Sequence, residues 1–364
     1  MEMNKPTIWI FSLEPLESRY TQQWQEHIPE LLTKNLGDKF NIVQVDGIQK
    51  NTVPTPGAFL NFSNTNYWKS SQMCAFLEHY NAGETTAQDQ FVFTDAWNPT
   101  TLQVKYMSDL LGFNWRLHAL WHAGSYDPHD FLGRLIGKAP WVRHSEKAFF
   151  HAVDHNYFAT DFHIEMFCHN LFECNPTDIT DFNTDKIVRT GWPMGYMDHV
   201  LDAYKGRAKH DLILFPHRIA PEKQVEIFRD LAQALPEYEF VVCQDRQLTK
   251  HEYHELLAAS KIVFSASLQE TLGIGCYEGA IVDALPMVPD RLSYTEMYDD
   301  QFKYPTNWTN NWENYLLNKE HLVEHIRHQM TNYEALVPFV RSQAESLTNS
   351  FFTAAEMIKH MQSD

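Results

Sequence analysis

Two glutamates eight positions apart, Glu270 and Glu278, bracket the segment Gly273-Ile274-Gly275. An apolar run over 261–265 precedes this segment and a helical pattern follows it, so we expect a turn between a strand and a helix. Glycines let the backbone approach a ligand, and the free N–H groups of a helix's first turn can bind an anion. The two carboxylates could then accept hydrogen bonds from sugar and ribose hydroxyls. The alternative is that Glu278 is a solvated helix residue and that the glycines only tighten the turn.

A second candidate group is formed by Arg218 and Lys223, five positions apart after an apolar run over 211–215. Ligands of open α/β sheets bind outside the carboxyl ends of the strands. There, arginine offers a bidentate fork to a diphosphate and lysine a point charge. The alternative is a pair of surface cations that bind Glu222 or Glu226. The nearby glutamate pair favours the diphosphate clamp.

The elements that must position these residues are predicted by short apolar runs alternating with helical patterns. In the N-terminal half the runs lie at 7–11, 40–45, 91–95 and 115–121, and in the C-terminal half at 211–215, 238–243, 261–265 and 285–288. Such alternation is typical of βαβ units and parallel sheets. We interpret roughly 186–210 as a linker and the tail from 318 as helical.

The composition limits the classes of protein that fit. The chain has 364 residues, of which 44% are hydrophobic, enough for packed cores. No apolar run approaches the roughly 20 residues of a membrane helix, and no signal-peptide pattern opens the chain. Five cysteines without zinc-finger spacing favour a reducing, cytoplasmic compartment, which is the host cytoplasm if a phage encodes the protein.

The net charge of −18, from 29 Lys and Arg against 47 Asp and Glu, counts against a surface that binds nucleic acid all over. A local basic patch could still form from a run of cations. The alternative is that this run is a solvated helix face. The run consists of Arg134, Lys138, Arg143, His144 and Lys147.

The C-terminal motifs resemble those of a known enzyme family. The order Arg-x4-Lys, strand–helix–strand, Glu-x7-Glu and a strand with Pro286 and Pro289 is similar to the nucleotide-sugar half of retaining GT-B glycosyltransferases of family 4. Pro-His-Arg at 216–218 with a later Tyr-x-Glu at 294–296 resembles the subgroup that glycosylates queuosine in tRNA. Unlike many members, the chain has no glycine in the loop at 12–19.

The resemblance implies an α/β GT-B fold, with two Rossmann-like domains facing each other across a cleft. The expected domains are an acceptor domain at 1–190 and a nucleotide-sugar domain at 191–340. A C-terminal helix at 341–364 is expected to cross back to the first domain. In such an arrangement, Arg218 and Lys223 would neutralise the donor diphosphate and Glu270 would hold the transferred sugar.

The resemblance also implies further binding residues. Glu278 would bind the donor ribose, and backbone amides would contact sugar and phosphate. These amides belong to Gly273, Ile274 and Gly275. In the N-terminal half, His122 at the end of a predicted strand would touch the reacting sugar, although a histidine satisfied within the fold is the alternative. Asp95 and Asp127, near strand ends, are candidates for acceptor binding.

The predicted activity is transfer of a sugar, with retention, from a UDP- or GDP-linked donor and without a cofactor or metal. No Asp-x-Asp occurs, and His151 and His155 have no third ligand nearby in sequence. The preferred acceptor is a hydroxymethylated pyrimidine in phage DNA; the alternatives are modified tRNA, a small metabolite or a polysaccharide. A non-catalytic nucleotide-sugar or nucleic-acid-binding module is the other class. No membrane partner is expected, and the oligomeric state is not predicted.

Overall fold

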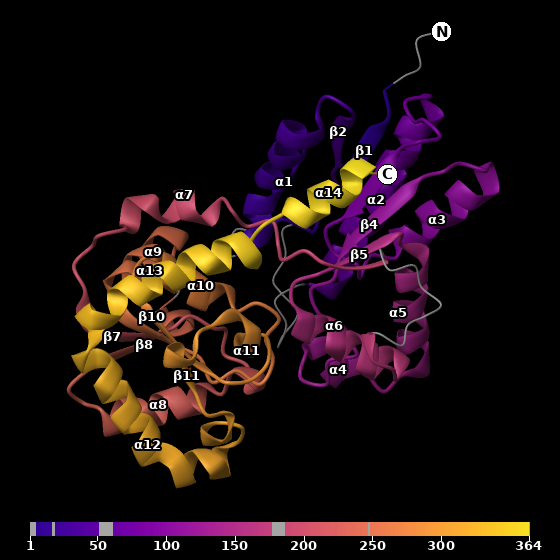
Figure 1. Ribbon diagram of the computed structural model, residues 1–364. Helices are drawn as coiled ribbons and strands as arrows, with labels where there is room; N and C mark the ends of the chain where they lie inside the picture. The colour runs from indigo at the N-terminus through magenta and orange to yellow at the C-terminus, as the bar shows by residue number, and fades with distance from the viewer. Residues whose placement is uncertain (1–4, 17–18, 51–60, 177–185, 247, 364) are drawn as a thin grey trace. The chain divides into compact units, whose positions relative to one another are not determined.

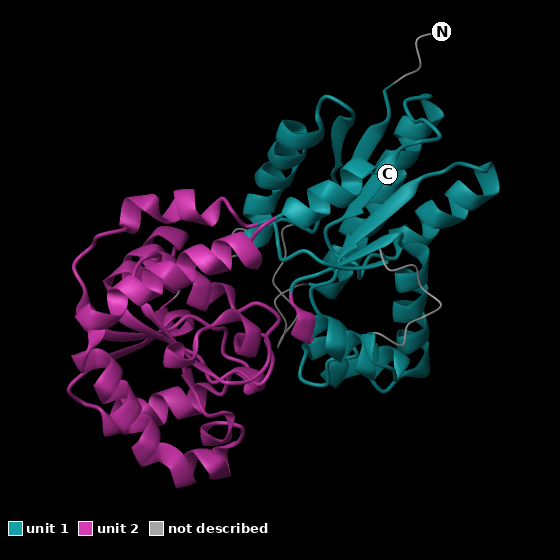
Figure 2. Ribbon diagram, viewed as in Figure 1, with its two compact units in different colours: residues 1–159, 163–193, 354–364 teal, residues 160–162, 194–353 magenta. Residues whose placement is uncertain are grey.

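The computed structural model describes residues 5–16, 19–50, 61–176, 186–246 and 248–363. The chain forms two compact units, drawn in different colours in Figure 2. The first unit contains residues 1–159, 163–193 and 354–364, and the second contains residues 160–162 and 194–353. The end of the chain therefore belongs to the first unit, while the stretch before it belongs to the second.

The first unit is built on a six-stranded parallel sheet of order β2-β1-β3-β4-β5-β6. The strands are β1 Thr7–Phe11, β2 Asn41–Val45, β3 Gln90–Phe93, β4 Arg116–Leu120, β5 His155–Phe158 and β6 Ile187–Arg189. From β1 the chain moves outward to β2 and then returns to the other side of β1 as β3. The direction of winding therefore reverses between β1 and β3, which is where α/β sheets form ligand-binding crevices.

Helices cover both faces of this sheet (Figure 1). Right-handed crossovers place α1 Tyr20–Leu36 on one face, where α14 Ala355–Ser363 joins it. On the other face lie α2 Phe62–Asn81, α3 Thr100–Leu111 and α5 Pro140–Ala152. Short helices α4 Phe131–Ile136 and α6 Asp161–Phe167 flank α5 in the chain.

Alternation along the strands supplies the core of the first unit. Trp9 and Phe11 of β1 and Phe91 of β3 are buried in one cluster with Met73 and Phe76 of α2. Because successive strand residues point to opposite faces, the intervening residues face α1 and α14. On that side the Gln90 amide donates to the Met361 carbonyl of α14 at 3.1 Å.

The second unit has a five-stranded parallel sheet of order β11-β10-β9-β7-β8, whose winding reverses between β7 and β9. The strands are β7 His210–Phe215, β8 Glu239–Val242, β9 Ser260–Phe264, β10 Leu285–Pro289 and β11 Lys303–Tyr304. Helices α8 Val225–Ala234 and α12 Trp312–Thr331 contact each other on one face. On the other face are α9 Lys250–Ala259, α10 Ile274–Ile281 and α13 Tyr333–Ser350. The short helices are α7 Met197–Leu201 and α11 Tyr294–Met297.

The expected fold class, α/β with two Rossmann-like domains, is confirmed, and each predicted strand lies within about two residues of an observed one. Strands β5, β6 and β11 and helix α2 are additional. β6 falls in the predicted linker over 186–210 and pairs with β5, so that part of the stretch is a sheet strand. Residues 17 and 18 of the glycine-free loop at 12–19 lie outside the described residues.

Hydropathy along the helices bears on membrane insertion. Within the described ranges, no helix combines the length and apolar character that crossing a bilayer requires.

Candidate functional site

The crevice of the second unit is bordered by the loops that leave β7 and β9. Residues 216–223 follow β7, and residues 265–273 follow β9 and lead into α10. The residues predicted to bind the donor lie on these two loops or in α10. Two strands that neighbour each other in the sheet, β7 and β9, therefore bring both sequence motifs to one edge.

At this edge, Lys223 and Glu270 form an ion pair. The Lys223 Nζ atom lies 2.9 Å from Oε2 of Glu270 and also donates to the carbonyl oxygen of Gln269. The side chains are 7% and 17% exposed. Burial by itself raises the pKa of Glu270, but Lys223, His217 and the Gly273 amide together lower that pKa below its ordinary value. Glu270 is thus an ionised carboxylate held by a cation from the neighbouring loop.

Arg218 pairs with Glu222, as the alternative interpretation of the sequence anticipated. Its Nη2 group donates to Oε1 of the buried Glu222. A guanidinium has five N–H donors, and the Arg218 side chain is 31% exposed. The pairing therefore orients the partly exposed Arg218 side chain on the loop after β7.

The glycines of the turn permit close packing. Gly273 has φ 70° and ψ 52°, a left-handed conformation, and a Cβ atom there would lie 2.6 Å from the Tyr294 ring. A Cβ atom on Gly275 would lie 2.8 Å from the Pro216 side chain, on the loop after β7. The N–H groups of Ile274 and Gly275 are in the first turn of α10 and have no partner within the helix.

Glu278 is buried inside the unit. Its Oε2 atom accepts a hydrogen bond from the Tyr253 hydroxyl at 2.6 Å, and Lys250 Nζ lies 3.7 Å from Oε1. Glu278 is therefore not a solvated helix residue. Burial and the neighbouring carboxylate raise the pKa of Tyr253 well above its ordinary value, so Tyr253 remains the donor.

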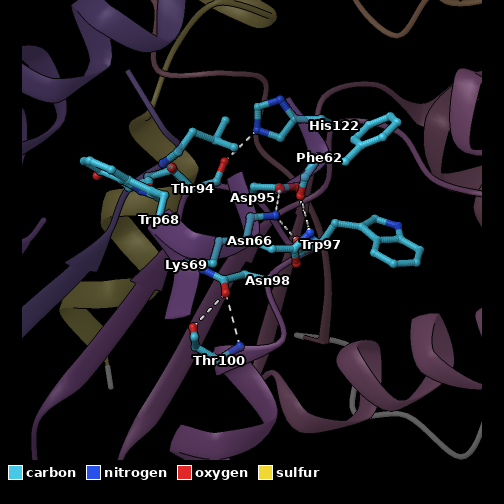
Figure 3. A network of polar contacts seen from close by, with 12 residues as sticks. Phe62, Asn66, Trp68, Lys69, Thr94, Asp95, Trp97, Asn98, Thr100 and His122 are labelled. Carbon is cyan, nitrogen blue, oxygen red and sulfur yellow. Dashed lines mark hydrogen bonds and ion pairs between the residues drawn. The ribbon is translucent and has the colours of Figure 1, made fainter. Parts of the chain in front are cut away.

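The first unit has a corresponding group of polar residues at the carboxyl ends of β1, β3 and β4. Figure 3 shows Lys69 of α2 reaching Asp95, with Nζ 2.9 Å from Oδ2. Lys69 also donates to the Trp97 carbonyl, and Asp95 accepts from the Trp97 N–H at 3.1 Å. Burial alone raises the pKa of Asp95, but Lys69 and His122 lower it overall. The predicted acceptor residue Asp95 is therefore an ion-paired carboxylate.

His122 uses both ring nitrogens inside this unit. Nε2 lies 2.6 Å from the carbonyl oxygen of Thr94 (Figure 3), which can only accept, so Nε2 carries the hydrogen. Nδ1 then accepts from the Tyr20 hydroxyl at 2.8 Å. Burial lowers the pKa of His122 to about 4, against the opposing effect of Asp95. His122 is neutral near pH 7, and both of its nitrogens contact protein atoms.

Asp127 is buried in the loop after β4. Its Oδ1 atom accepts a hydrogen bond from the His129 N–H at 2.9 Å. This is a local side-chain-to-backbone turn of the kind that fixes loop geometry. This hydrogen bond from the His129 N–H to Asp127 therefore stabilises the loop after β4.

Glu146, a residue of α5 that the sequence did not single out, ties two of these loops together. It is fully buried, and its carboxylate accepts from the Ser125 N–H at 2.5 Å, the Ser125 hydroxyl at 2.6 Å and the Trp97 indole at 2.9 Å. Burial raises the pKa of Glu146 despite these hydrogen bonds. A glutamate within a helical pattern gives no sequence signal for such a role.

Lys69 was also missed, because α2 was not predicted. In α2, the buried residues Trp68, Gln72 and Phe76 have helical spacing, and Asn61 caps the first turn of the helix. These features could have identified the helix. Nothing in the sequence would have directed Lys69 to Asp95.

Among the residues that the structure describes, no three His, Cys, Asp or Glu side chains are grouped as ligands for a metal ion. His151 lies in α5 and His155 in β5, so the two do not share a helix face.

Comparison with known proteins gives structural matches only. No family model matches the chain, and no curated protein matches its sequence. The structure is similar to the sucrose-phosphate synthase of Thermosynechococcus elongatus, with a TM-score of 0.59, 11% identity and coverage of 99% of this chain and 98% of that one. It is similarly close to the catalytic domain of Arabidopsis thaliana starch synthase IV bound to ADP and acarbose, with a TM-score of 0.59, 12% identity and full coverage of both chains.

A third similar structure is the pneumococcal O-GlcNAc transferase GtfA in complex with UDP and GlcNAc. The TM-score is 0.50 and the identity 14%, over 82% of this chain and 60% of that one. The chain thus spans about three fifths of the length of GtfA. At these identities the likeness shows the fold, which is that of GT-B glycosyltransferase structures.

Proposed function

We propose that the chain is a glycosyltransferase that transfers a sugar from a nucleotide-sugar donor to a hydroxyl group. The observation that carries this proposal is the buried Lys223–Glu270 pair, with Arg218 on the same loop as Lys223, at the carboxyl edge of the second sheet. This edge combines cations that suit a diphosphate with a carboxylate that suits sugar hydroxyls. GT-B structures bound to UDP or ADP are among the similar folds, which supports the same use here.

In this proposal, the second unit stabilises the leaving group. As the bond between the anomeric carbon and the diphosphate breaks, negative charge grows on the phosphate oxygen. Arg218, Lys223 and the first N–H groups of α10 would hold that charge more tightly in the transition state than in the ground state. Glu270 would accept hydrogen bonds from the transferred sugar, and Glu278 from the donor ribose.

We further propose that the reaction retains the anomeric configuration, needs no metal ion and uses a UDP- or GDP-linked donor. The motif resemblance implies all three features. Lys223 and Arg218 could supply the charge compensation that a divalent ion provides elsewhere. We therefore expect activity to persist in excess EDTA, and the released or transferred sugar to keep the donor's anomeric configuration by NMR.

His122 takes a supporting place in this scheme. Both of its nitrogens contact Thr94 and Tyr20, so we propose that it positions the Tyr20 hydroxyl beside the reacting sugar. In this scheme it carries no proton to or from the substrate. Asp95 would contribute through its pairing with Lys69, which fixes the loop after β3.

The proposal is tested by thermal shift with UDP, GDP and ADP, followed by assays for release of nucleoside diphosphate from UDP-glucose, GDP-mannose and ADP-glucose. A ligand at 100 times its Kd stabilises the folded state by about 2.7 kcal/mol. We expect one nucleotide to raise Tm in the wild type and in Arg229→Ala, which removes an exposed cation of α8, and to have little effect in Arg218→Ala or Lys223→Ala. The alternative of a non-catalytic module predicts nucleotide binding without turnover. No stabilisation by any nucleotide contradicts both.

A further inference from the structure

The loop after β7 holds a buried histidine to which the proposed reaction gives no role. His217 lies directly before Arg218 and is 8% exposed. Its Nε2 atom is buried and, within the described part of the chain, makes no hydrogen bond. Buried polar atoms in folded proteins are nearly always satisfied, so this nitrogen calls for an explanation.

The contacts of the His217 ring define where its hydrogen lies. The imidazole hydrogen-bonds the carbonyl oxygen of Phe264, the last residue of β9. It also packs edge-on against the Phe215 ring, with centroids 5.1 Å apart. A carbonyl oxygen can only accept, and Nε2 is the nitrogen without a partner. Nδ1 therefore carries the hydrogen, and Nε2 keeps a lone pair that can bind a proton.

The charged groups that act on His217 are those of the proposed diphosphate site. They are Lys223 and Arg218 of its own loop and Glu270 of the loop after β9. Burial lowers the pKa of His217 to about 3, and Lys223 adds to this effect while Glu270 opposes it. His217 is therefore neutral near pH 7 in this environment.

The two cations of this crevice are each paired with a carboxylate. The Lys223 Nζ atom lies 2.9 Å from Oε2 of Glu270. Arg218 pairs with the buried Glu222. The two pairs together carry no net charge, whereas the diphosphate of a nucleotide sugar carries two negative charges. Further positive charge would stabilise such an anion in a partly buried site, and the first N–H groups of α10 supply only a partial charge.

A neutral imidazole beside an arriving anion can supply that charge. An opposite charge within about 4–6 Å favours the charged form of a titratable group, and the effect strengthens where water is excluded. The diphosphate would thus oppose the burial that keeps His217 neutral. A cation that forms only on donor binding also avoids the destabilisation that a permanent, unpaired buried charge would cause.

We propose that Nε2 of His217 takes up one proton from solvent when the donor diphosphate binds, so that the imidazolium becomes a third positive charge beside Arg218 and Lys223. One N–H bond forms in this step and no bond of the donor breaks. The proton returns to solvent when the nucleoside diphosphate leaves. The inference rests on the proposed glycosyltransferase function and deepens it, because it couples donor binding to proton uptake. Since linkage is reciprocal, donor affinity should rise as the pH falls.

The first test is titration calorimetry with UDP-glucose, GDP-mannose and ADP-glucose at pH 7, in buffers of different ionisation enthalpy. This measurement counts the protons taken up per ligand, and the diphosphate of these ligands does not itself titrate near pH 7. The control is His254→Gln, because His254 of α9 is also buried with an unpartnered Nε2, but the charged groups acting on it are Lys250 and His251. We expect uptake of about one-half to one proton by the wild type and by His254→Gln, and none by His217→Gln.

The same proteins separate proton coupling from packing. Between pH 8 and pH 6, we expect the donor affinity of the wild type and of His254→Gln to rise by up to about tenfold per pH unit, and that of His217→Gln to stay nearly constant. Equal proton uptake in the wild type and His217→Gln, or donor binding by the wild type without proton uptake, would overturn the inference and leave the proposed function standing. A wild type that binds no nucleotide sugar would contradict the proposed function as well.

A measurement on the wild type alone covers the case in which His217→Gln does not fold. In protein labelled with ¹³C at the histidine Cε1 position, NMR distinguishes the neutral ring from the imidazolium. The resonance of His217 is identified by its NOE contacts with the Phe215 ring. We expect this resonance to move to the imidazolium position at saturating donor and pH 7. A resonance that keeps its neutral position would overturn the inference.

Discussion

The ammonium nitrogen of Lys223 lies 2.9 Å from Oε2 of Glu270, so a residue predicted to bind the diphosphate is paired with one predicted to bind the sugar. Each reaches the other from a loop after a different strand, β7 for Lys223 and β9 for Glu270. The pair therefore links the two motifs across the crevice of the second unit. A donor entering the crevice would meet both charges already in place, which is the preorganisation that electrostatic catalysis requires.

The first prediction concerns removal of one member of this pair. Lys223→Met and Glu270→Gln each leave the partner buried without its counter-charge, which typically costs about 3–5 kcal/mol. We expect each single variant to lower Tm and to reduce kcat/KM at least about 100-fold. The double variant should recover part of the lost Tm without recovering activity. Scanning calorimetry and release of nucleoside diphosphate measure the two effects.

The control for this pair is Lys261→Met, because Lys261 pairs at 2.6 Å with an exposed Asp211 in the same unit. Surface pairs contribute about 0–1 kcal/mol, so this variant should keep its activity and nearly all of its Tm. Strictly additive losses of Tm in the Lys223 and Glu270 double variant would show that the two residues are not coupled.

A second prediction uses two glycines with the same positive φ. Gly273 and Gly206 both have φ of 70°, but a Cβ atom meets the Tyr294 ring at 2.6 Å on Gly273 and nothing within 4 Å on Gly206. Left-handed backbone costs a residue with a side chain roughly 1–2 kcal/mol in both cases. Gly206→Ala should therefore lose about this much stability and no activity.

Gly273→Ala should lose more, because the Tyr294 ring or the start of α10 must move. The Gly273 amide also contacts Glu270, so we expect at least a tenfold fall in kcat/KM as well. Denaturant unfolding and the nucleoside diphosphate assay compare the two variants. Equal stability and activity in both would show that the close approach to Tyr294 has no consequence.

Much of the second unit's crevice could be predicted from sequence, because its residues come in local motifs. Arg218 and Lys223 are five residues apart and Glu270 and Glu278 eight apart, and apolar runs mark the strands before them. The pairing of Arg218 with Glu222 was also among the sequence alternatives. The burial of Glu278 was not, because a single glutamate in α10 does not reveal that Tyr253 from α9 will cover it.

The first unit was less predictable for a physical reason. Its contacts join residues far apart in sequence: Lys69 with Asp95, Tyr20 with His122, and Glu146 with Ser125. Such pairings depend on how helices cover the sheet, which hydrophobic periodicity does not specify for single polar residues. Strand β5 was missed because it opens with His155 and Asn156. Both are buried, and Asn156 accepts from the Trp121 indole at 2.8 Å.

A third prediction concerns Glu146. Replacing it with alanine leaves the Ser125 N–H, the Ser125 hydroxyl and the Trp97 indole without their acceptor and opens a cavity in the core of the first unit. We expect a loss of about 2–5 kcal/mol in stability. Glu146→Gln keeps the shape and one carbonyl acceptor, so it should lose clearly less.

We assign Glu146 a structural role. The residues of the second unit named above are instead proposed to bind the donor. Nucleotide affinity, measured by titration calorimetry at a temperature where the variants are folded, should be unchanged in both Glu146 variants. A specific loss of nucleotide affinity with full stability would contradict this assignment.

The last prediction is the pH dependence of stability that the buried histidine His122 confers. Burial lowers its pKa to about 4, whereas in the unfolded chain it titrates near the ordinary value of 6.5. As the pH falls from 6.5 to about 4, the unfolded state takes up a proton that the folded state does not. Stability therefore decreases across this window, by at most about 1.4 kcal/mol per pH unit for this residue, and its contribution levels off below pH 4.

The lowered pKa of Glu270 adds a separate loss at lower pH. Its carboxylate contributes stability that is present above pH 4.5 and disappears as the pH falls through its folded-state value. Urea midpoints measured at pH 7.5, 6.5, 5.5 and 4.5 isolate the histidine effect. His122→Gln should flatten the decline, and His144→Gln, which changes an exposed histidine of α5 in the same unit, should follow the wild type. A decline of equal steepness in all three proteins would show that His122 takes up its proton in the folded state as readily as in the unfolded one.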